Sequence, residues 1–290
     1  MRELRLSLLR GVCQTPAYVA YERGYFAEEE LGAEISIAPT AWAVPARLAA
    51  GASEFGLIPW TRAAATAGGG EEALVVVCGS GHQEAAIVAR AGIEVSEVRT
   101  VTVPRRGGMK DLTAMALLES LGWEDAEVRR QPSGDGAIIS LFGEGCDAAS
   151  MVEPYATMME ELGVGRILRR TADVWPGVPG CCLTTSARLR DDDPELVGSV
   201  VRAFARGVQF VREDPEATAE IAAPYIGVAS RFIRKALARN PPDADAIRNS
   251  DAIDNVLSTM VRLGYLEAPP TGFLDHSFLD GVAAELGAPQ

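Results

Sequence analysis

Residues 5–26 of the chain read RLSLLRGVCQTPAYVAYERGYF. An apolar run ends at Arg10-Gly11 and a helical pattern begins near Pro16, so we expect a strand, a loop and then a helix. The loop places a cysteine, a glutamine and a threonine where the backbone turns. Polar groups at such a point predict a site that either holds a ligand or changes a substrate.

The same alternation of strand and helix continues through the first 190 residues. It predicts an α/β fold with largely parallel sheets. Further strands are expected at 33–39, 54–60, 71–81, 85–90, 99–104, 126–131, 147–152, 166–174 and 180–186, and helices at 16–31, 44–51, 110–122, 135–145 and 155–163. From Asp193-Pro194 onward the pattern is helical, with further helices expected at 228–239, 249–264 and 273–286.

The length of 290 residues favours two lobes over one. A helical tail without strands of its own is expected to pack on the first lobe, so the chain would pass between the lobes twice. We therefore expect a discontinuous first lobe of residues 1–83 plus 185–290, and a second lobe of residues 84–184.

The net charge of the chain limits the kinds of partner that it can bind. There are 27 Lys and Arg residues against 40 Asp and Glu residues, a net charge of −13. This balance excludes a broad surface for nucleic acid or anionic membrane, but it leaves room for a local basic pocket. Neither a membrane-spanning run nor a secretory signal is visible, which indicates a cytoplasmic protein as the sequence stands, or a periplasmic or extracellular one if an export signal was removed.

Three motifs, in order, carry a family resemblance: TPAYVAYERGYFAEEELGAEISI from residue 15, RLAAGASEFGLIPW from residue 47 and GEGCDAASMVEPYA from residue 143. They resemble the substrate-binding proteins of sulfonate, nitrate and thiamine-precursor transport. The resemblance implies a two-lobed periplasmic-binding-protein fold of type II, with a small-molecule ligand in the cleft between the lobes. It also implies a possible ABC permease as partner.

Two groups of residues are candidates for contacting the ligand. Arg105 and Arg106 follow a strand and precede a helix start, where free backbone N–H groups bind anions; the alternative is two surface ion pairs. Arg10, Cys13 and Gln14 lie at the end of the first strand, where the family places ligand contacts.

Aromatic and hydrogen-bonding side chains complete the predicted cleft. The tryptophans near cleft loops suit a flat or apolar ligand, unless they pack in the core: Trp42, Trp60 and Trp175. The resemblance places Glu153 and Tyr155 in the cleft, although Glu153 alternatively pairs with Arg105 or Arg106. His82 follows a glycine-rich turn and either contacts the ligand or is solvated.

We expect neither cofactor nor metal. The adjacent Cys181 and Cys182 cannot chelate one zinc ion in the Cys-x-x-Cys manner, which favours two buried strand cysteines. An enzyme on the same scaffold is the alternative to a binding protein, with Cys13 as nucleophile and His82 as general base. Cys13 and Pro16 resemble the nucleophile region of an aryl sulfinate desulfinase, but the histidine after that enzyme's second strand has no match here.

Overall fold

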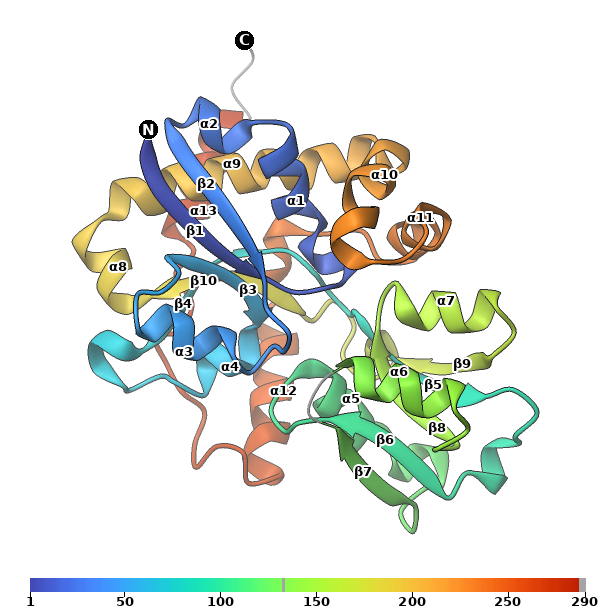
Figure 1. Cartoon of the computed structure of the whole chain (residues 1–290). Coiled ribbons are helices and arrows are strands. Elements are labelled where there is room, and N and C mark those ends of the chain that lie inside the picture. The colour runs from blue at the N-terminus through green and yellow to red at the C-terminus, as the bar shows by residue number, and fades with distance from the viewer. Residues whose placement is uncertain (132–133, 287–290) are drawn as a thin grey trace.

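The structure is a computed structural model that describes residues 1–131 and 134–286. Two five-stranded sheets lie in separate halves of the molecule (Figure 1). The first sheet has the order β2-β1-β3-β10-β4 and comprises β1 (Arg2–Leu8), β2 (Leu31–Ile37), β3 (Phe55–Pro59), β4 (Leu74–Gly79) and β10 (Cys181–Ser186). β1 pairs in parallel with β2 and β3, whereas β10 runs antiparallel between β3 and β4.

The second sheet repeats this plan with the order β7-β6-β8-β5-β9. Its strands are β5 (Ala85–Arg90), β6 (Thr100–Pro104), β7 (Glu127–Gln131), β8 (Ala148–Val152) and β9 (Gly165–Arg170). β6 pairs in parallel with β7 and β8, and β5 is antiparallel to both β8 and β9. In each sheet one antiparallel strand therefore connects the parallel units to the other half.

Helices cover both sheets. They are α1 (Thr15–Glu22), α2 (Tyr25–Glu28), α3 (Val44–Ala49), α4 (Trp60–Ala64), α5 (Met109–Leu117), α6 (Gly134–Phe142), α7 (Tyr155–Glu161), α8 (Ala187–Asp192), α9 (Pro194–Glu213), α10 (Pro215–Ile226), α11 (Ser230–Arg239), α12 (Ser250–Arg262) and α13 (Ser277–Leu286). The single helix expected over 16–31 is two helices, because Gly24 adopts a left-handed φ of 76° between them. The expected helix start is confirmed, since Asp193 caps α9 by accepting from the backbone N–H of Leu196 at 3.0 Å.

The chain passes between the sheets at residues 80–84 and again at 171–180. The expected boundary at residue 184 falls inside β10, whose pairing with β3 and β4 places residues 181–184 in the first sheet. The two crossing segments hydrogen-bond to each other: the N–H of Gly81 donates to Cys181, and that of Gln83 to Val178. This pairing brings residues almost 100 positions apart side by side.

The helical tail packs mainly on the first half, as expected. The apolar stripe of α9 lies along α1, and α13 packs on α9 and β4. Two tail helices also reach the second half, because α11 contacts α7 and α12 contacts α5 (Figure 1). The tail therefore touches both walls of the space between the sheets.

Candidate functional site

A cavity of about 280 Å³ lies between the two sheets. Its walls come from the segments that follow β1, β2, β3, β6 and β8, together with Ile138 of α6, Glu84 of the first crossing segment and Cys181 at the start of β10. The strands of open α/β sheets present their carboxyl ends to such a crevice, which is where ligands bind. The volume falls just below the roughly 300–1,000 Å³ typical of drug-sized ligand sites, so the cavity suits a small solute.

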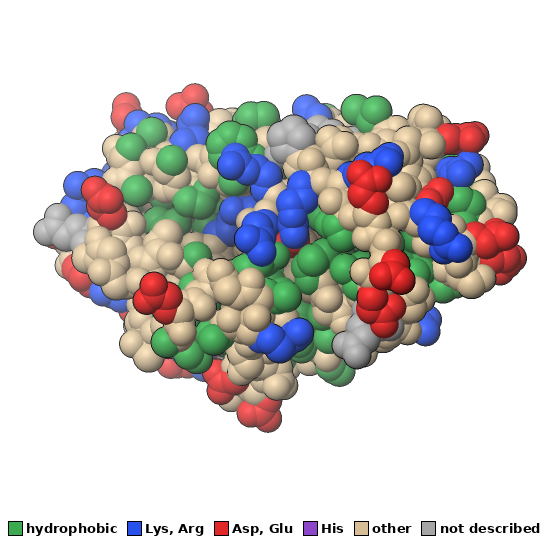
Figure 2. Space-filling model, turned by 90° about the horizontal axis from the view of Figure 1, so that it is seen from below, with side chains coloured by type: hydrophobic (Ala, Val, Ile, Leu, Met, Phe, Trp, Pro, Cys, Tyr) green, Lys and Arg blue, Asp and Glu red, His purple; other side chains and the backbone are tan. Residues whose placement is uncertain are grey.

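The lining of the cavity is rich in positive charge. Of its ionisable side chains other than cysteine and tyrosine, four are cationic and one is anionic: Arg10, Arg62, Arg105 and Lys110 against Glu84. Apolar side chains fill much of the remaining wall, among them Ile37, Met109, Ile138 and Met151. Figure 2 shows one face of the molecule on which Lys and Arg side chains gather beside hydrophobic ones. The chain has a net charge of −13, so the positive charge of the cavity lining is opposite in sign to that of the whole protein.

Among these cations, Arg62 has a buried nitrogen without a hydrogen-bond partner among the described residues. α4 begins directly after β3, and this places the Arg62 side chain in the cavity wall. One terminal nitrogen donates to the Arg106 carbonyl at 3.4 Å, while the buried Nε has no hydrogen-bond partner in the described part of the chain. Burial lowers the pKa of Arg62, although the nearby Asp111 carboxylate opposes that shift. Arg62 therefore brings to the cavity wall a guanidinium whose hydrogen bonds are incomplete.

Arg105 and Trp42 join the two halves at the cavity. The Arg105 guanidinium lies over the Trp42 ring, 4.6 Å from its centroid. Trp42 follows β2 of the first sheet and Arg105 follows β6 of the second. A second link lies close by, since the Thr61 hydroxyl donates to the Gly107 carbonyl at 2.7 Å. Contacts across the gap therefore hold the two walls together in this conformation.

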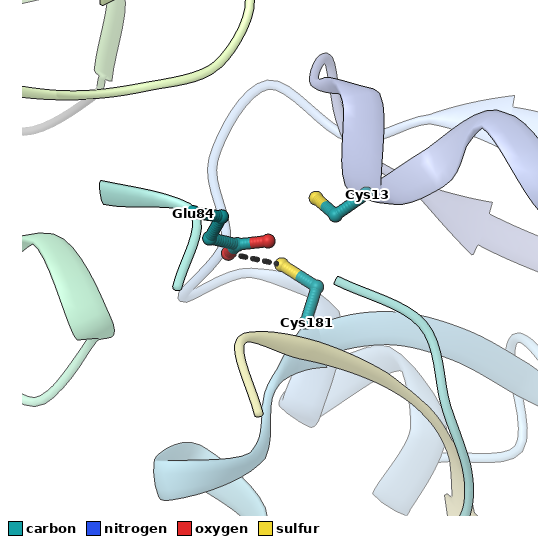
Figure 3. Close-up of side chains that lie close together, drawn as sticks. All are labelled: Cys13, Glu84 and Cys181. Atoms are coloured by element: carbon teal, nitrogen blue, oxygen red, sulfur yellow. Dashed lines mark hydrogen bonds between the residues drawn. The ribbon is translucent and has the colours of Figure 1, made fainter. Parts of the chain in front are cut away.

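Cys13, Glu84 and Cys181 form another part of the wall (Figure 3). One donor atom of each lies within 4.8 Å of those of the other two, and the Cys181 thiol donates to Glu84 Oε1 at 3.1 Å. A hydrogen bond with Cys181 lowers the pKa of Cys13, but burial and the charge of Glu84 raise it, and the net shift is upward. A hydrogen bond with Cys13 and burial raise the pKa of Cys181 well above its ordinary value.

Five of the residues predicted for the site line the cavity: Arg10, Cys13, Trp42, Arg105 and Tyr155. Tyr155 also donates through its hydroxyl to the Ile226 carbonyl at 3.2 Å, which ties the second half to the helical tail. Gln14 lies behind the wall instead. Its Oε1 accepts from the Leu9 backbone at 2.9 Å, and its amide nitrogen donates to Cys13 Sγ at 3.2 Å.

Three further predicted residues lie outside the cavity lining. Trp60 is fully buried, donates to the Pro179 carbonyl at 2.8 Å and stacks on Phe273. Trp175 is buried in the hydrophobic core. Arg106 lies over the ring of Tyr265 in the helical tail, 4.6 Å from its centroid. The core-packing alternative thus describes Trp60 and Trp175.

Glu153 is fully buried in an ion pair outside the cavity lining. Its Oε1 accepts from Arg170 at 2.7 Å, and its Oε2 accepts from the Thr157 backbone at 3.0 Å. The partner is therefore Arg170, not the expected Arg105 or Arg106. A carboxylate paired in this way fixes the start of α7 and the edge strand β9 rather than a ligand.

The enzyme alternative placed His82 beside Cys13 as a base. His82 lies in the first crossing segment, where burial lowers its pKa and its Nδ1 has no partner among the described residues. The ionisable side chains grouped with Cys13 are instead Glu84 and Cys181. A nucleophilic cysteine needs a depressed pKa, so the upward shift at Cys13 opposes that role.

Sequence reasoning missed four lining residues with chemical character: Arg62, Glu84, Lys110 and Cys181. Arg62 was missed because α4 itself was not expected after β3. For Glu84 the sequence offers one weak indication of a role in the site, because its carboxylate stands alone between a glycine-rich turn and the apolar run of β5. Cys181 was expected as a buried strand residue, and only the pairing of the crossing segments places it at the cavity.

A family model described as the NMT1-like family matches residues 1–226. The chain belongs to the NMT1-like family. The resemblance inferred from the three motifs is thereby confirmed. No curated protein sequence matches the chain at a significant level.

Solved structures with the same fold are numerous and distant in sequence. The ligand-binding component of an ABC-type import system from Staphylococcus aureus, with zinc bound, is 15% identical with a TM-score of 0.85, covering 97% of this chain and 99% of that one. The periplasmic nitrate-binding protein NrtA from Synechocystis PCC 6803 is 14% identical with a TM-score of 0.84, covering 100% and 90%.

The alkanesulfonate-binding protein SsuA from Xanthomonas axonopodis pv. citri, bound to MOPS, is 14% identical with a TM-score of 0.76, covering 93% of this chain and 95% of that one. These likenesses show that the expected two-lobed α/β fold of periplasmic binding proteins is correct. Among the described residues, no helix combines the length and the apolar character needed to cross a membrane.

Proposed function

We propose that this protein is the solute-binding component of an import system and that it holds a small anion in the cavity between its two sheets. The observation that carries the proposal is the concentration of Arg10, Arg62, Arg105 and Lys110 around one cavity of a strongly acidic chain. Clefts lined by charge of one sign concentrate ligands of the opposite sign.

The donors of the site suit an oxyanion with a short organic group. Arg62 lines the cavity, and a guanidinium binds carboxylate, sulfonate or phosphate oxygens through charge-assisted hydrogen bonds. The opposing walls carry Ile37, Met109 and Met151 together with the Trp42 ring, which accommodate apolar or aromatic carbon. A cavity of about 280 Å³ suits a solute somewhat smaller than a drug-sized ligand.

The similar structures support the same ligand class. Two of the proteins named above bind an alkanesulfonate and nitrate, both of which are anions. On the basis of these similar structures, we further propose that a membrane permease of the ABC type receives the solute from this protein. The proposal also places the protein on the side of the membrane from which solute is taken up.

A panel of small anions tests the proposal. Nitrate, methanesulfonate, benzenesulfonate, benzoate and phosphate are each titrated into the protein by calorimetry, with ethylammonium and glycerol as cationic and neutral controls. We expect saturable one-to-one binding for at least one anion and for neither control, with affinity falling as salt rises. Binding only of the cation or the neutral compound, or equal anion binding after Arg62→Met, would overturn the proposal.

A further inference from the structure

Two thiols and a carboxylate meet in the cavity wall in an arrangement that suits a metal ion. Zinc is held by sulfur at about 2.3 Å and by carboxylate oxygen at about 2.0–2.2 Å, so two sulfur ligands of one tetrahedral ion lie about 3.8 Å apart. The donor atoms of Cys13, Glu84 and Cys181 all lie within 4.8 Å of one another. Small side-chain rotations therefore bring all three to bonding distance of a common point.

The fold holds these donors together through its crossing segments. The backbone N–H of Gly81 donates to the Cys181 carbonyl at 2.9 Å, and that of Gly180 to the Gly81 carbonyl at 2.7 Å. Ser80 fixes the first loop by donating its hydroxyl to the Cys13 carbonyl at 2.5 Å. Three segments distant in sequence are thus locked to one another at the cluster.

Two glycines, Gly81 and Gly180, leave the space that the Glu84 carboxyl group occupies beside the thiols. A Cβ atom at Gly81 would lie 2.2 Å from Glu84 Oε2 and 2.5 Å from the Cys13 Cβ, and one at Gly180 would lie 2.6 Å from the Glu84 Cδ. Any larger residue at either position would push the Glu84 side chain away from the sulfur atoms. The close approach of Glu84 to the thiols is therefore a built feature of the backbone.

One carboxylate oxygen in the cluster lacks a partner. Glu84 is only 3% exposed, and its Oε2 has no hydrogen bond among the described residues. Figure 3 shows the two sulfur atoms and the carboxyl group facing a common space. A buried carboxylate oxygen without a hydrogen bond is costly, and a bound cation is one of the few groups that satisfies it.

We propose that Cys13, Glu84 and Cys181 form a binding site for a zinc ion whose fourth coordination position faces the cavity. Two thiolates with one carboxylate form a donor set that zinc accepts and that hard cations such as Mg²⁺ and Ca²⁺ do not favour. Gln14 supports the same site, because its side-chain amide donates a hydrogen bond to Cys13 Sγ and so stabilises a thiolate at Cys13. All three donors line the cavity, so the remaining position is open to solvent or solute.

The site would add a Lewis acid to a cavity that already carries four cationic side chains. An oxyanion held there gains a direct bond from one oxygen to the metal, besides its hydrogen bonds to arginine. This consequence rests on the proposed anion-binding function, whereas the metal site itself does not. The test below therefore uses the metal alone.

Cobalt is the probe, because Co²⁺ replaces zinc in tetrahedral sites and thiolate ligation gives it a charge-transfer absorption. The full chain is reduced, kept free of oxygen and checked for five free thiols, the number that the structure contains. We expect one Co²⁺ per chain with the thiolate absorption, and stoichiometric displacement by Zn²⁺. Glu84→Gln and Cys181→Ser should each weaken Zn²⁺ binding by more than about 100-fold, since even an outer-shell partner is worth 10- to 100-fold.

Cys182→Ser is the matched control, because Cys182 is a buried cysteine adjacent on β10 that lies outside the cluster. It should bind Co²⁺ as the unmodified chain does. Circular dichroism of each metal-free variant checks folding, and Glu84→Gln, nearly isosteric, is the variant least expected to unfold. The proposal is overturned if the reduced chain binds no Co²⁺ or if binding survives Glu84→Gln.

Discussion

Replacing Arg62 with methionine should change stability and ligand affinity in opposite directions. Methionine keeps most of the apolar stem but removes a half-buried charge whose Nε has no hydrogen-bond partner among the described residues. Leaving a buried donor unpaired costs about 1–3 kcal/mol, and the weak 3.4 Å bond to the Arg106 carbonyl offsets part of that. We expect the ligand-free Arg62→Met protein to be more stable by about 1 kcal/mol, a rise in Tm of about 2 °C.

The same substitution should weaken anion binding strongly. A hydrogen bond to a charged group contributes about 1.5–3 kcal/mol, which corresponds to a rise of about 10- to 150-fold in Kd. Differential scanning calorimetry of the ligand-free protein and titration calorimetry with the best-binding anion of the panel measure the two effects.

Arg105→Met is the comparison for this experiment, because Arg105 also lines the cavity but is exposed, with its guanidinium over the Trp42 ring. It should weaken binding without raising Tm. A fall in Tm for Arg62→Met, together with an unchanged Kd, would refute the reasoning, because it would make Arg62 a structural residue.

Three further outcomes follow from the contacts described above. Glu153→Gln should lower the free energy of unfolding by about 1.5–3 kcal/mol in chemical denaturation, because it removes the buried charge that accepts from the partly exposed Arg170, and it should leave anion affinity unchanged; a loss below 1 kcal/mol would contradict the buried pair. Trp42→Ala should speed anion release about two- to fivefold in stopped-flow measurements. This factor corresponds to about 0.5–1 kcal/mol, the contribution of an exposed cation–π contact such as the one with Arg105. An unchanged release rate would remove Trp42 from the site. In the metal-free protein the pKa of the Cys13 thiol is raised and the thiol stays protonated at neutral pH. Its alkylation by iodoacetamide, followed by peptide mass spectrometry, should therefore be slow at pH 7 and accelerate only above the ordinary thiol pKa of about 8.5. Rapid modification at pH 7 would revive the nucleophile alternative.

Local patterns in the sequence sufficed for most of the fold. The continuous apolar run at residues 74–78 predicted a buried strand, and β4 is buried throughout. The Asp193-Pro194 start predicted α9 because capping is a local interaction. The patterns failed where short helices follow strands directly, as in α4 and α8, since a helix of five or six residues has too few positions to show a period.

The candidate site was less predictable, because its residues are brought together by pairings distant in sequence. Position after a strand predicted Arg10, Cys13 and Arg105 at the cavity, and all three line it. Position did not distinguish them from Trp60, which follows β3 but turns into the core. A strand end fixes where a side chain begins and not the direction in which it points.

The cysteine cluster shows the same limit most clearly. Adjacent cysteines with no other Cys or His near in sequence predict no metal site at Cys181-Cys182. The structure joins Cys181 to Cys13 and Glu84 through the hydrogen-bonded crossing segments. Such a triad has no spacing motif, because each donor comes from a different segment of the chain.

Native mass spectrometry of the protein after exposure to a cell metabolite extract tests the central claim most directly. The bound molecule is released and identified, and the exposure is repeated with Arg62→Met. The account predicts one small anion per chain, recovered chemically unchanged, whose occupancy falls sharply in the variant. Recovery of a neutral or cationic compound, or of an anion retained equally by Arg62→Met, would contradict it.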